Sequence, residues 1–305
     1  MPIDGAGSGK TTGGAPRNST NTSVAVHARL FPARTTKGTP CHRHYVENVQ
    51  ITMAESFGVK GRGKFYEETG IIRDVIQNHL LQVVSYLAME PPVATQPEAI
   101  RDEQAKVLRT VRPLRPEDTV RGQFAGYRDE PGVAKDSTRG TYAAVRLYVD
   151  SWRWHGVPFF VRAGKSLART VTEVFIEFRA APPVVFPEPA PEQGNYIRFR
   201  LSPHVAIALG ARAKRPGEGM TGEPVELVVM EEAEDAAGRI DAYERLLGDA
   251  TLFARQDVVE AAWEIVDPLI REPQPVHGYE PGSWGPGAAD RLVSDIGGWN
   301  IPEPE

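Results

Sequence analysis

Alternating apolar and polar positions in the middle of the chain predict a succession of β-strands. The alternation is found in four segments, at 174–178, 197–201, 205–209 and 225–229. Strands that follow one another without intervening helices pair as an antiparallel sheet. An earlier strand is expected at 46–53, where apolar residues stand among polar ones.

A helical period precedes and follows these strands. Apolar residues recur at helical spacing over 72–87, shortly after Gly70. A second helix is predicted at 98–111, and two further helical stretches are expected near 241–254 and 257–266. Together the patterns predict an α+β fold, with a large, mainly antiparallel sheet and helices packed on one of its faces.

The first 42 residues differ in composition from the rest of the chain. Five glycines fall within the first fourteen positions, and no sustained apolar period follows them. We expect residues 1–42 to form a disordered leader and residues 43–305 to form the folded domain. The segment 273–305 is rich in proline, glycine and tryptophan, and we expect it to wrap the surface.

The leader contains a partial match to a phosphate-binding loop, from Asp4 to Thr11. That pattern requires a glycine where Asp4 stands. It also requires a buried strand before the loop to hold the backbone amides, and only three residues precede Asp4. We therefore interpret the segment as part of the leader and not as a nucleotide site.

Composition narrows the classes of function. The 40 acidic residues outnumber the 35 Lys and Arg, for a net charge of −5, whereas a nucleic-acid partner would require a basic excess. A small anionic substrate is compatible with this balance, because a few local cations suffice to bind it. The single cysteine, Cys41, permits neither an internal disulfide nor a cysteine metal cluster, and it favours the cytoplasm. No apolar run approaches the roughly 20 residues of a membrane helix, so no membrane partner is predicted. No metal is predicted either.

Polar residues gather around the strongest predicted helix. His79 lies on its apolar side, where a lone histidine is most often a core residue with satisfied hydrogen bonds. Its neighbours favour a binding site instead, because Asp74 and Asn78 are four residues apart and share a face of an α-helix. The glycines of 61–63 would allow close backbone approach to a ligand, and Glu55 ends the preceding strand.

A second polar cluster, Arg162–Lys165, ends an apolar strand expected at 157–161. The residues alone leave two interpretations open. The cluster is a solvated strand end, or it contains a cation that a rigid strand places to meet an anion or a hydroxyl.

Several segments together resemble glucose-6-phosphate dehydrogenases. The longest runs from Gly61 to Gln82 and contains the run IIRDVIQNHLLQ. Four shorter segments occur in the family's order, at Ile100–Glu103, Phe159–Lys165, Asp241–Leu246 and Tyr279–Pro286. The similarity extends from about Arg43 to Trp299 and corresponds to the family's C-terminal, substrate-binding domain.

The resemblance implies an oxidoreductase of the pentose phosphate pathway, which oxidises glucose 6-phosphate to 6-phosphogluconolactone and passes a hydride to NADP. It assigns His79 as the general base for the C1 hydroxyl proton, a task that suits imidazole because its pKa lies near the working pH. Glu55 and Asp74 correspond to residues that accept hydrogen bonds from the sugar hydroxyls, and Lys165 to a substrate-binding lysine. The resemblance also implies a homodimer formed through the sheet.

The sequence departs from the family at two positions near these residues. The position five after Lys165 is often Lys or Arg in the family and is Thr170 here, with Arg169 adjacent. Both residues stay open as substrate contacts. Lys60 stands where a Glu is usual.

Two family features are not recognised in the sequence. NADP binds on an N-terminal Rossmann domain that opens with a glycine-rich strand–turn–helix. An Arg-x-Asp-His-Tyr motif orients the catalytic histidine and binds the phosphate, but His44-Tyr45 is followed by Val46 and does not continue that motif. We therefore expect a truncated form without cofactor-binding residues and without activity by itself. The alternative is a non-catalytic dimerisation or regulatory partner of a complete dehydrogenase subunit.

Overall fold

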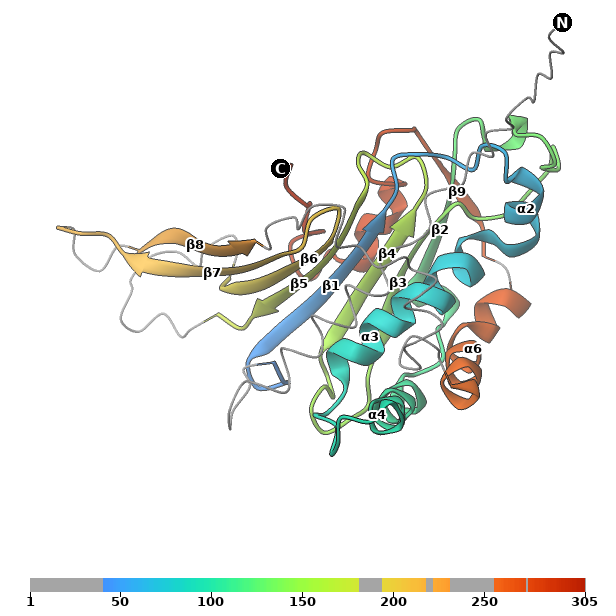
Figure 1. Cartoon of the computed structure of the whole chain (residues 1–305). Helices are drawn as coiled ribbons and strands as arrows, with labels where there is room; N and C mark the ends of the chain where they lie inside the picture. Colours follow the sequence, from blue (N-terminus) through green and yellow to red (C-terminus); the bar gives the residue numbers. More distant parts are fainter. Residues whose placement is uncertain (1–40, 181–193, 218–221, 231–254, 273, 305) are drawn as a thin grey trace, which may run out of the picture.

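The computed structural model describes residues 41–180, 194–217, 222–230, 255–272 and 274–304. Their main feature is a nine-stranded sheet in the order β8-β7-β6-β5-β1-β4-β3-β2-β9 (Figure 1). The strands are β1 (Val46–Ala54), β2 (Thr119–Phe124), β3 (Tyr142–Tyr148), β4 (Pro158–Gly164), β5 (Val171–Phe178), β6 (Tyr196–Ser202), β7 (Ala206–Lys214), β8 (Gly222–Met230) and β9 (Val276–Tyr279).

Most neighbouring strands are antiparallel, which confirms the prediction from the alternation. The exceptions within this sheet are two parallel pairs, β1 with β4 and β2 with β9. β1 lies between β5 and β4, so the earliest strand is placed at the centre of the sheet. The register aligns Ala54, at the end of β1, with Gly164, at the end of β4. The residues that follow these two strands therefore meet at the same edge of the sheet.

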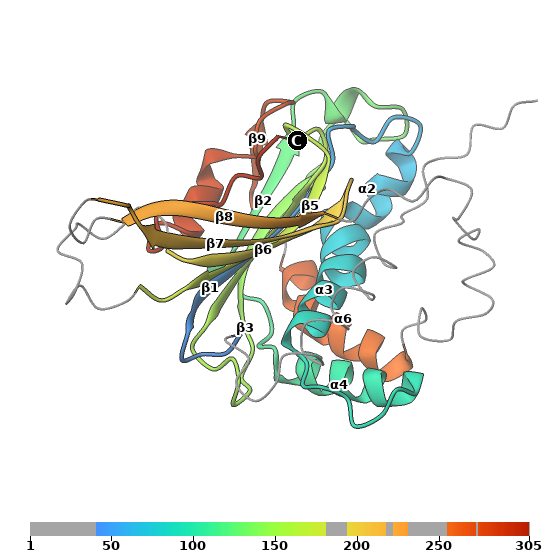
Figure 2. The same cartoon turned by 60° about the vertical axis from the view of Figure 1, so that its left-hand side comes forward.

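Helices cover one face of the half of the sheet that contains β1, β4, β3 and β2, as the α+β prediction required (Figures 1 and 2). The longer ones are α2 (Gly63–Ile71), η1 (Ile72–Leu80), α3 (Leu81–Ala88), α4 (Pro97–Thr110) and α6 (Gln256–Arg271). Three short turns of 3-10 helix are η2 (Pro116–Asp118), η3 (Tyr127–Asp129) and η6 (Gly287–Leu292). The stretch expected near 257–266 is part of α6, whereas the one near 241–254 lies outside the described residues.

The helix predicted at 72–87 is confirmed, but part of it is wound more widely than an α-helix. Gly70 has φ 63° and ψ 173° and interrupts the helical path at the end of α2. Ile72–Leu80 then form the π-helix η1, and the Leu81 N–H donates to the Ile76 carbonyl. Short π-helical segments are frequent at functional sites. Apolar spacing alone does not distinguish this winding from that of an α-helix.

The two faces of the central strands are covered by different parts of the chain. Val49 and Ile51 of β1 belong to the core that the helices share. Gln50 alternates with them and faces the C-terminal segment, where the Asn300 N–H donates to its Oε1 at 2.7 Å. Trp299 packs edge-on against Phe160 of β4. Described residues of 274–304 thus lie against the second face of the sheet, in agreement with the expected wrapping of the surface.

The expected disordered leader lies almost wholly outside the described residues, which begin at Cys41. Cys41 is 2% exposed, and its carbonyl accepts a hydrogen bond from Arg153 Nε at 2.9 Å. Packing against the domain therefore includes residues before the boundary expected at 43. None of the helices in the described ranges is long and apolar enough to cross a membrane.

Candidate functional site

Glu55 and Lys165 lie side by side at the edge where β1 and β4 end. The Glu55 N–H donates to the Gly164 carbonyl at 3.0 Å, and the Lys165 N–H donates to the Thr141 carbonyl at 3.0 Å. Lys165 Nζ and Glu55 Oε2 form an ion pair. The Lys165 side chain is only 6% exposed and that of Glu55 is 22% exposed. The parallel register therefore brings two predicted site residues into direct contact.

Two aromatic rings hold the Lys165 ammonium from its other sides. Its Nζ lies 5.6 Å from the ring centroid of Phe57, in the loop after β1, and 5.6 Å from that of Tyr66 on α2. A cation at this distance from an aromatic face is attracted by the ring quadrupole. Tyr66 is 1% exposed, and its hydroxyl has no hydrogen-bond partner among the described residues.

His79 and Asp74 are on the π-helix η1, and both are half-buried. Burial lowers the pKa of His79 below its ordinary value, and the Lys165 ammonium lowers it further. The carboxylates of Asp74 and Glu55 act in the opposite direction and raise this pKa, but by less than burial lowers it. The imidazole is thus held in its neutral form near pH 7, the form that accepts a proton. All four predicted residues share one electrostatic environment, and their individual roles stay predictions.

The Arg162–Lys165 cluster divides between the two faces of the sheet. Arg162 is 1% exposed and donates to Thr52 Oγ1 at 3.0 Å and to the Asn300 carbonyl at 2.8 Å. Its guanidinium also stacks between Trp284 and Trp299, at 5.0 and 4.7 Å from the ring centroids. Arg162 therefore anchors the C-terminal segment to the sheet, and Lys165 alone of this cluster's cations reaches the site.

Thr170 and Arg169, which the sequence left as alternatives, make different contacts. The Thr170 hydroxyl accepts the Ser56 N–H at 3.0 Å and lies 3.0 Å from the Ser56 hydroxyl. It thereby ties the loop after β4 to the loop after β1. The Arg169 guanidinium lies 5.9 Å from the Trp284 ring centroid, and its Nη1 has no hydrogen-bond partner among the described residues. Arg169 keeps an unused donor, and Thr170 is engaged within the protein.

Tyr66, Phe57 and Tyr279 belong to the surroundings of the site and were not singled out by the sequence. Tyr279 Oη donates to the Lys165 carbonyl at 2.7 Å and lies 3.0 Å from Thr141 Oγ1. Each of these contacts joins residues that are distant in the chain. The only signal in the sequence is the presence of aromatic residues beside the motif glycines, which is too general to predict such contacts.

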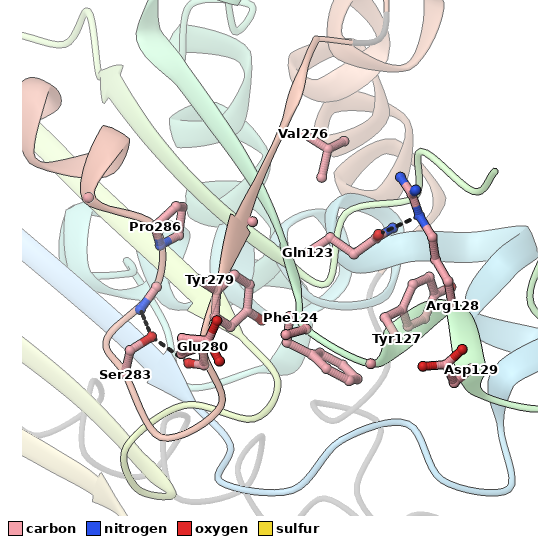
Figure 3. A pocket seen from close by; sticks show the side chains of 15 residues that line it. Gln123, Phe124, Tyr127, Arg128, Asp129, Val276, Tyr279, Glu280, Ser283 and Pro286 are labelled. Carbon is pink, nitrogen blue, oxygen red and sulfur yellow. Dashed lines mark hydrogen bonds between the residues drawn. The ribbon is translucent and has the colours of Figure 1, made fainter. Parts of the chain in front are cut away.

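A separate cavity of about 730 Å³ opens beside this site, between the end of β2 and β9 (Figure 3). Phe124, Tyr127 and Tyr279 contribute rings to it, and Arg128, Glu280 and Ser283 contribute polar groups. None of the four predicted site residues lines it. Tyr279 links the two places, because its ring lines the cavity and its hydroxyl supports Lys165.

The described residues provide neither a metal site nor a dinucleotide cradle. They contain no group of three or more His, Cys, Asp or Glu placed to hold a metal ion. A glycine loop, 58–63, connects β1 to α2, but Gly63 is packed so closely that a Cβ there would lie 2.3 Å from the Pro131 carbonyl oxygen. β1 also reaches its parallel neighbour β4 only after β2 and β3. This arrangement does not fit the dinucleotide cradle of a βαβ unit, in which a pyrophosphate approaches the loop.

The sequence of this chain is similar to those of proteins of one known family. Residues 39–300 match the family model "Glucose-6-phosphate dehydrogenase, C-terminal domain". The "Glucose-6-phosphate 1-dehydrogenase 1" of Mycobacterium tuberculosis (strain ATCC 25618 / H37Rv) is 44% identical over 268 residues, which cover 85% of this chain and 56% of that protein. The "Glucose-6-phosphate 1-dehydrogenase" of Aggregatibacter actinomycetemcomitans is 42% identical over 284 residues, covering 86% of this chain and 57% of that protein.

Two solved structures have the same fold. The crystal structure of glucose-6-phosphate 1-dehydrogenase from Mycobacterium avium superposes with a TM-score of 0.84 at 39% identity, over 94% of this chain and 64% of that one. A glucose-6-phosphate dehydrogenase in complex with its substrate glucose-6-phosphate gives a TM-score of 0.81 at 31% identity, over 94% and 63% of the two chains. The chain thus spans about half the length of the curated relatives it matches, 56% and 57% of them.

Proposed function

Because this chain belongs to the glucose-6-phosphate dehydrogenase family and matches its C-terminal domain, we propose that residues 43–305 form a domain that binds glucose 6-phosphate. The reaction served is the oxidation of this sugar to 6-phosphogluconolactone, with NADP as the hydride acceptor. The proposal is supported by the ion pair between Glu55 and Lys165 at the edge of the sheet, together with the electrostatic effect of both residues and of Asp74 on His79. The cytoplasm is the proposed location.

His79 is the proposed general base. Oxidation at C1 breaks the O–H bond of the C1 hydroxyl and the C1–H bond, so the proton and the hydride leave in different directions. The proton goes to a ring nitrogen of His79, whose pKa is lowered mainly by burial. A neutral imidazole can accept this proton, and the carboxylates of Asp74 and Glu55 then stabilise the imidazolium that forms.

Glu55, Asp74 and Lys165 position the sugar in this proposal. Carboxylate oxygens accept several hydrogen bonds each and are suited to sugar hydroxyls. Lys165 is held by Glu55 and by the Tyr66 ring, so its donors are directed before the substrate arrives. Of the two alternatives, Arg169 is the proposed further substrate contact. Its Nη1 has no partner among the described residues, whereas the Thr170 hydroxyl is engaged by Ser56.

The described residues supply no dinucleotide cradle, so none of them is assigned to NADP. We therefore expect the 305-residue chain to bind the sugar phosphate without reducing NADP at a measurable rate. A hydride transfer requires the donor and acceptor carbons to be held near contact, and this positioning contributes about 7–11 kcal/mol in well-oriented reactions. An absorbance assay at 340 nm checks this expectation, and turnover that disappears in His79→Ala contradicts it.

Assembly of two copies through the sheet is the second part of the proposal. The outer strands β7 and β8 expose apolar side chains, namely Leu209, Val225, Leu227, Val228 and Val229. Contiguous exposed apolar residues on a sheet mark an interface with another chain. The same surface would serve the alternative role, in which this chain is a non-catalytic partner that pairs with a complete dehydrogenase subunit.

Calorimetric titration of the purified chain with glucose 6-phosphate tests the proposed binding. We expect Lys165→Gln to weaken binding at least about tenfold, because a charge-assisted hydrogen bond to the substrate contributes about 1.5–3 kcal/mol. The exposed Lys60, on the loop that leads to α2, provides the matched control. Lys60→Gln makes the same change of charge and should leave affinity within about twofold. Equal affinities of wild type and Lys165→Gln, with both proteins folded, contradict the proposed site.

A further inference from the structure

Three arginines surround a small cavity at the start of the π-helix η1. The cavity has a volume of about 40 Å³ and lies between Gly70, β2 and α6. Arg73 of η1, Arg121 of β2 and Arg139 of the loop before β3 line it. Neither Glu55, His79 nor Lys165 is among its lining residues, so the cavity is separate from the proposed sugar site.

Arg121 is the buried member of this group. It is 6% exposed, and its two terminal nitrogens donate to backbone carbonyls, Nη1 to Gln274 at 2.9 Å and Nη2 to Thr138 at 2.8 Å. Its Nε is buried and has no hydrogen-bond partner among the described residues. The guanidinium is therefore fixed at both terminal nitrogens, while one buried donor is left unsatisfied.

The positive charge at this cavity is not neutralised by the described part of the protein. None of the three arginines forms an ion pair with a carboxylate of the described residues, and Arg73 Nη1 donates to the Glu68 carbonyl at 3.1 Å. Burial lowers the pKa of Arg121, and the charge of Arg139 lowers it further. Burying a guanidinium near another cation is costly unless an anion compensates both.

The backbone adds to the attraction for an anion. Gly70 has φ 63° and breaks the helix, so that η1 restarts beside the cavity. The start of a helix carries the positive end of the helix dipole and amide groups that lack intrahelical acceptors. The Ile71 N–H is already bonded to the Gly140 carbonyl at 2.9 Å and closes one wall.

We propose that this cavity binds a tetrahedral oxyanion of the phosphate type, held by Arg73, Arg121 and Arg139. A cavity needs about 10–15 Å³ to hold one water molecule, so this volume accepts a group of a few oxygen atoms and little more. Inorganic phosphate fits as a whole. The phosphate of a phosphomonoester would fit only with the rest of the molecule outside. This proposal does not depend on the proposed sugar site.

Binding of phosphate to the full chain, measured by calorimetry at constant ionic strength with chloride as the reference, tests the site. Arg139 is exposed, so Arg139→Gln should fold normally. We expect this variant to weaken phosphate binding about tenfold, the effect of losing one charge-assisted contact. Lys135 is the matched control, because it is 80% exposed on the same loop and does not line the cavity. Lys135→Gln should bind phosphate as wild type does.

A second variant closes the cavity without changing charge. Gly140 lines the cavity, and a methyl group there would lie 3.2 Å from the Tyr142 carbonyl oxygen and 3.5 Å from Arg121 Nε. It would occupy the space of a ligand oxygen beside Nε, so Gly140→Ala should abolish phosphate binding if the folded protein is retained. Lys165→Gln separates the two proposed sites, since it should impair glucose 6-phosphate binding and leave inorganic phosphate binding intact. If glucose 6-phosphate competes with phosphate in that variant, the ligand is a phosphomonoester. If phosphate has no effect beyond that of chloride, or if Arg139→Gln binds it like wild type, the cavity holds water only and the proposal is wrong.

Discussion

The strands β4 and β8 belong to one sheet but lie in opposite environments. In β4 every residue after Pro158 is buried, with helices on one side and the C-terminal segment on the other. In β8 residues 224–229 are all exposed. β8 lies at the outer edge of a region, β6 to β8, that extends beyond the helices (Figures 1 and 2). The first region is buried within this chain, and the second exposes apolar residues to which we assign the proposed assembly.

The buried strands and the outer strands also differ in their proposed roles, which are ligand binding and association with another copy. The proposed sugar site lies where the buried strands β1 and β4 end, and rigid strands hold its side chains in position. The outer strands carry exposed Leu and Val in place of such groups. A change in the first region should therefore affect stability and ligand binding, and a change in the second should affect association with another copy.

The largest expected difference is in the stability of the two regions. Phe159 of β4 is 0% exposed, and Phe159→Ala should lower the free energy of unfolding by about 3–5 kcal/mol. Leu227 of β8 is 69% exposed, and Leu227→Ala should change it by less than about 0.5 kcal/mol in the monomer. Urea unfolding at low protein concentration measures both. Similar losses in the two variants would mean that the outer strands are buried within the monomer.

Association of two copies is the next effect in size. A charge at Leu227 would be desolvated in an interface between two β8 strands, so Leu227→Asp should raise the dimer dissociation constant at least about tenfold. Analytical ultracentrifugation over a range of concentrations measures this constant. Val93→Asp is the control, because Val93 is 96% exposed and lies outside the outer strands. A wild-type chain that stays monomeric at high concentration contradicts the proposed assembly.

A smaller effect should appear in the pH dependence of stability. The folded state lowers the pKa of His79 below 6.5, so the unfolded chain binds more protons between the two values. Stability contributed by the neutral imidazole is therefore complete above pH 6.5 and decreases as the pH falls toward the folded pKa, with a slope of at most about 1.4 kcal/mol per pH unit. His79→Gln should remove this component from unfolding curves measured between pH 7.5 and 5.5.

The exposed His155 provides a matched control for that measurement. His155→Gln should leave the His79 component of the pH dependence in place. An identical pH dependence of wild type and His79→Gln would mean that burial does not perturb this histidine.

The smallest difference in stability should come from two tyrosine hydroxyls, one beside the proposed sugar site and one on the outer strands. Tyr66 Oη has no partner among the described residues, so Tyr66→Phe should change stability by less than about 0.5 kcal/mol or increase it slightly. Tyr196 of β6 donates to Glu226 of β8, so Tyr196→Phe should cost about 0.5–1.5 kcal/mol. Denaturant titrations compare the two. A clear loss in Tyr66→Phe would show that its hydroxyl is engaged in solution.

The half-buried strands were predictable from the sequence because each has one apolar and one polar face. This holds for β6, whose buried and half-buried residues alternate from Tyr196 to Ser202. The helix that carries Asp74 and His79 was predictable for the same reason. The roles of the site residues were predicted from the resemblance to a family. Spacing alone could not exclude the other interpretations, such as a core position for the histidine.

The contacts within the site were not predictable from local patterns. Glu55 and Lys165 are 110 residues apart and meet because β1 pairs in parallel with β4. Such pairing is decided by the topology of the whole sheet, since either strand could have neighboured another. Arg162, three residues before Lys165, faces the C-terminal segment. This contact could not be predicted either, because it depends on the tryptophans of that segment folding back against β4.

The winding of η1 has a consequence for how the site tolerates changes in chain length. Five residues advance an α-helix by about 140° beyond a full turn, which would direct Asp74 and His79 to different sides. In a π-helix the hydrogen bonds join residues five apart, so these two side chains lie on the same side, as their electrostatic interaction requires. Rewinding this segment as an ordinary α-helix with its present length would separate the carboxylate from the imidazole. Deletion of one residue between them would instead leave the two side chains four residues apart, a spacing that also puts them on one face of an α-helix. Along this segment the winding of the helix and the number of residues between the two side chains must therefore match if the pair is to stay together.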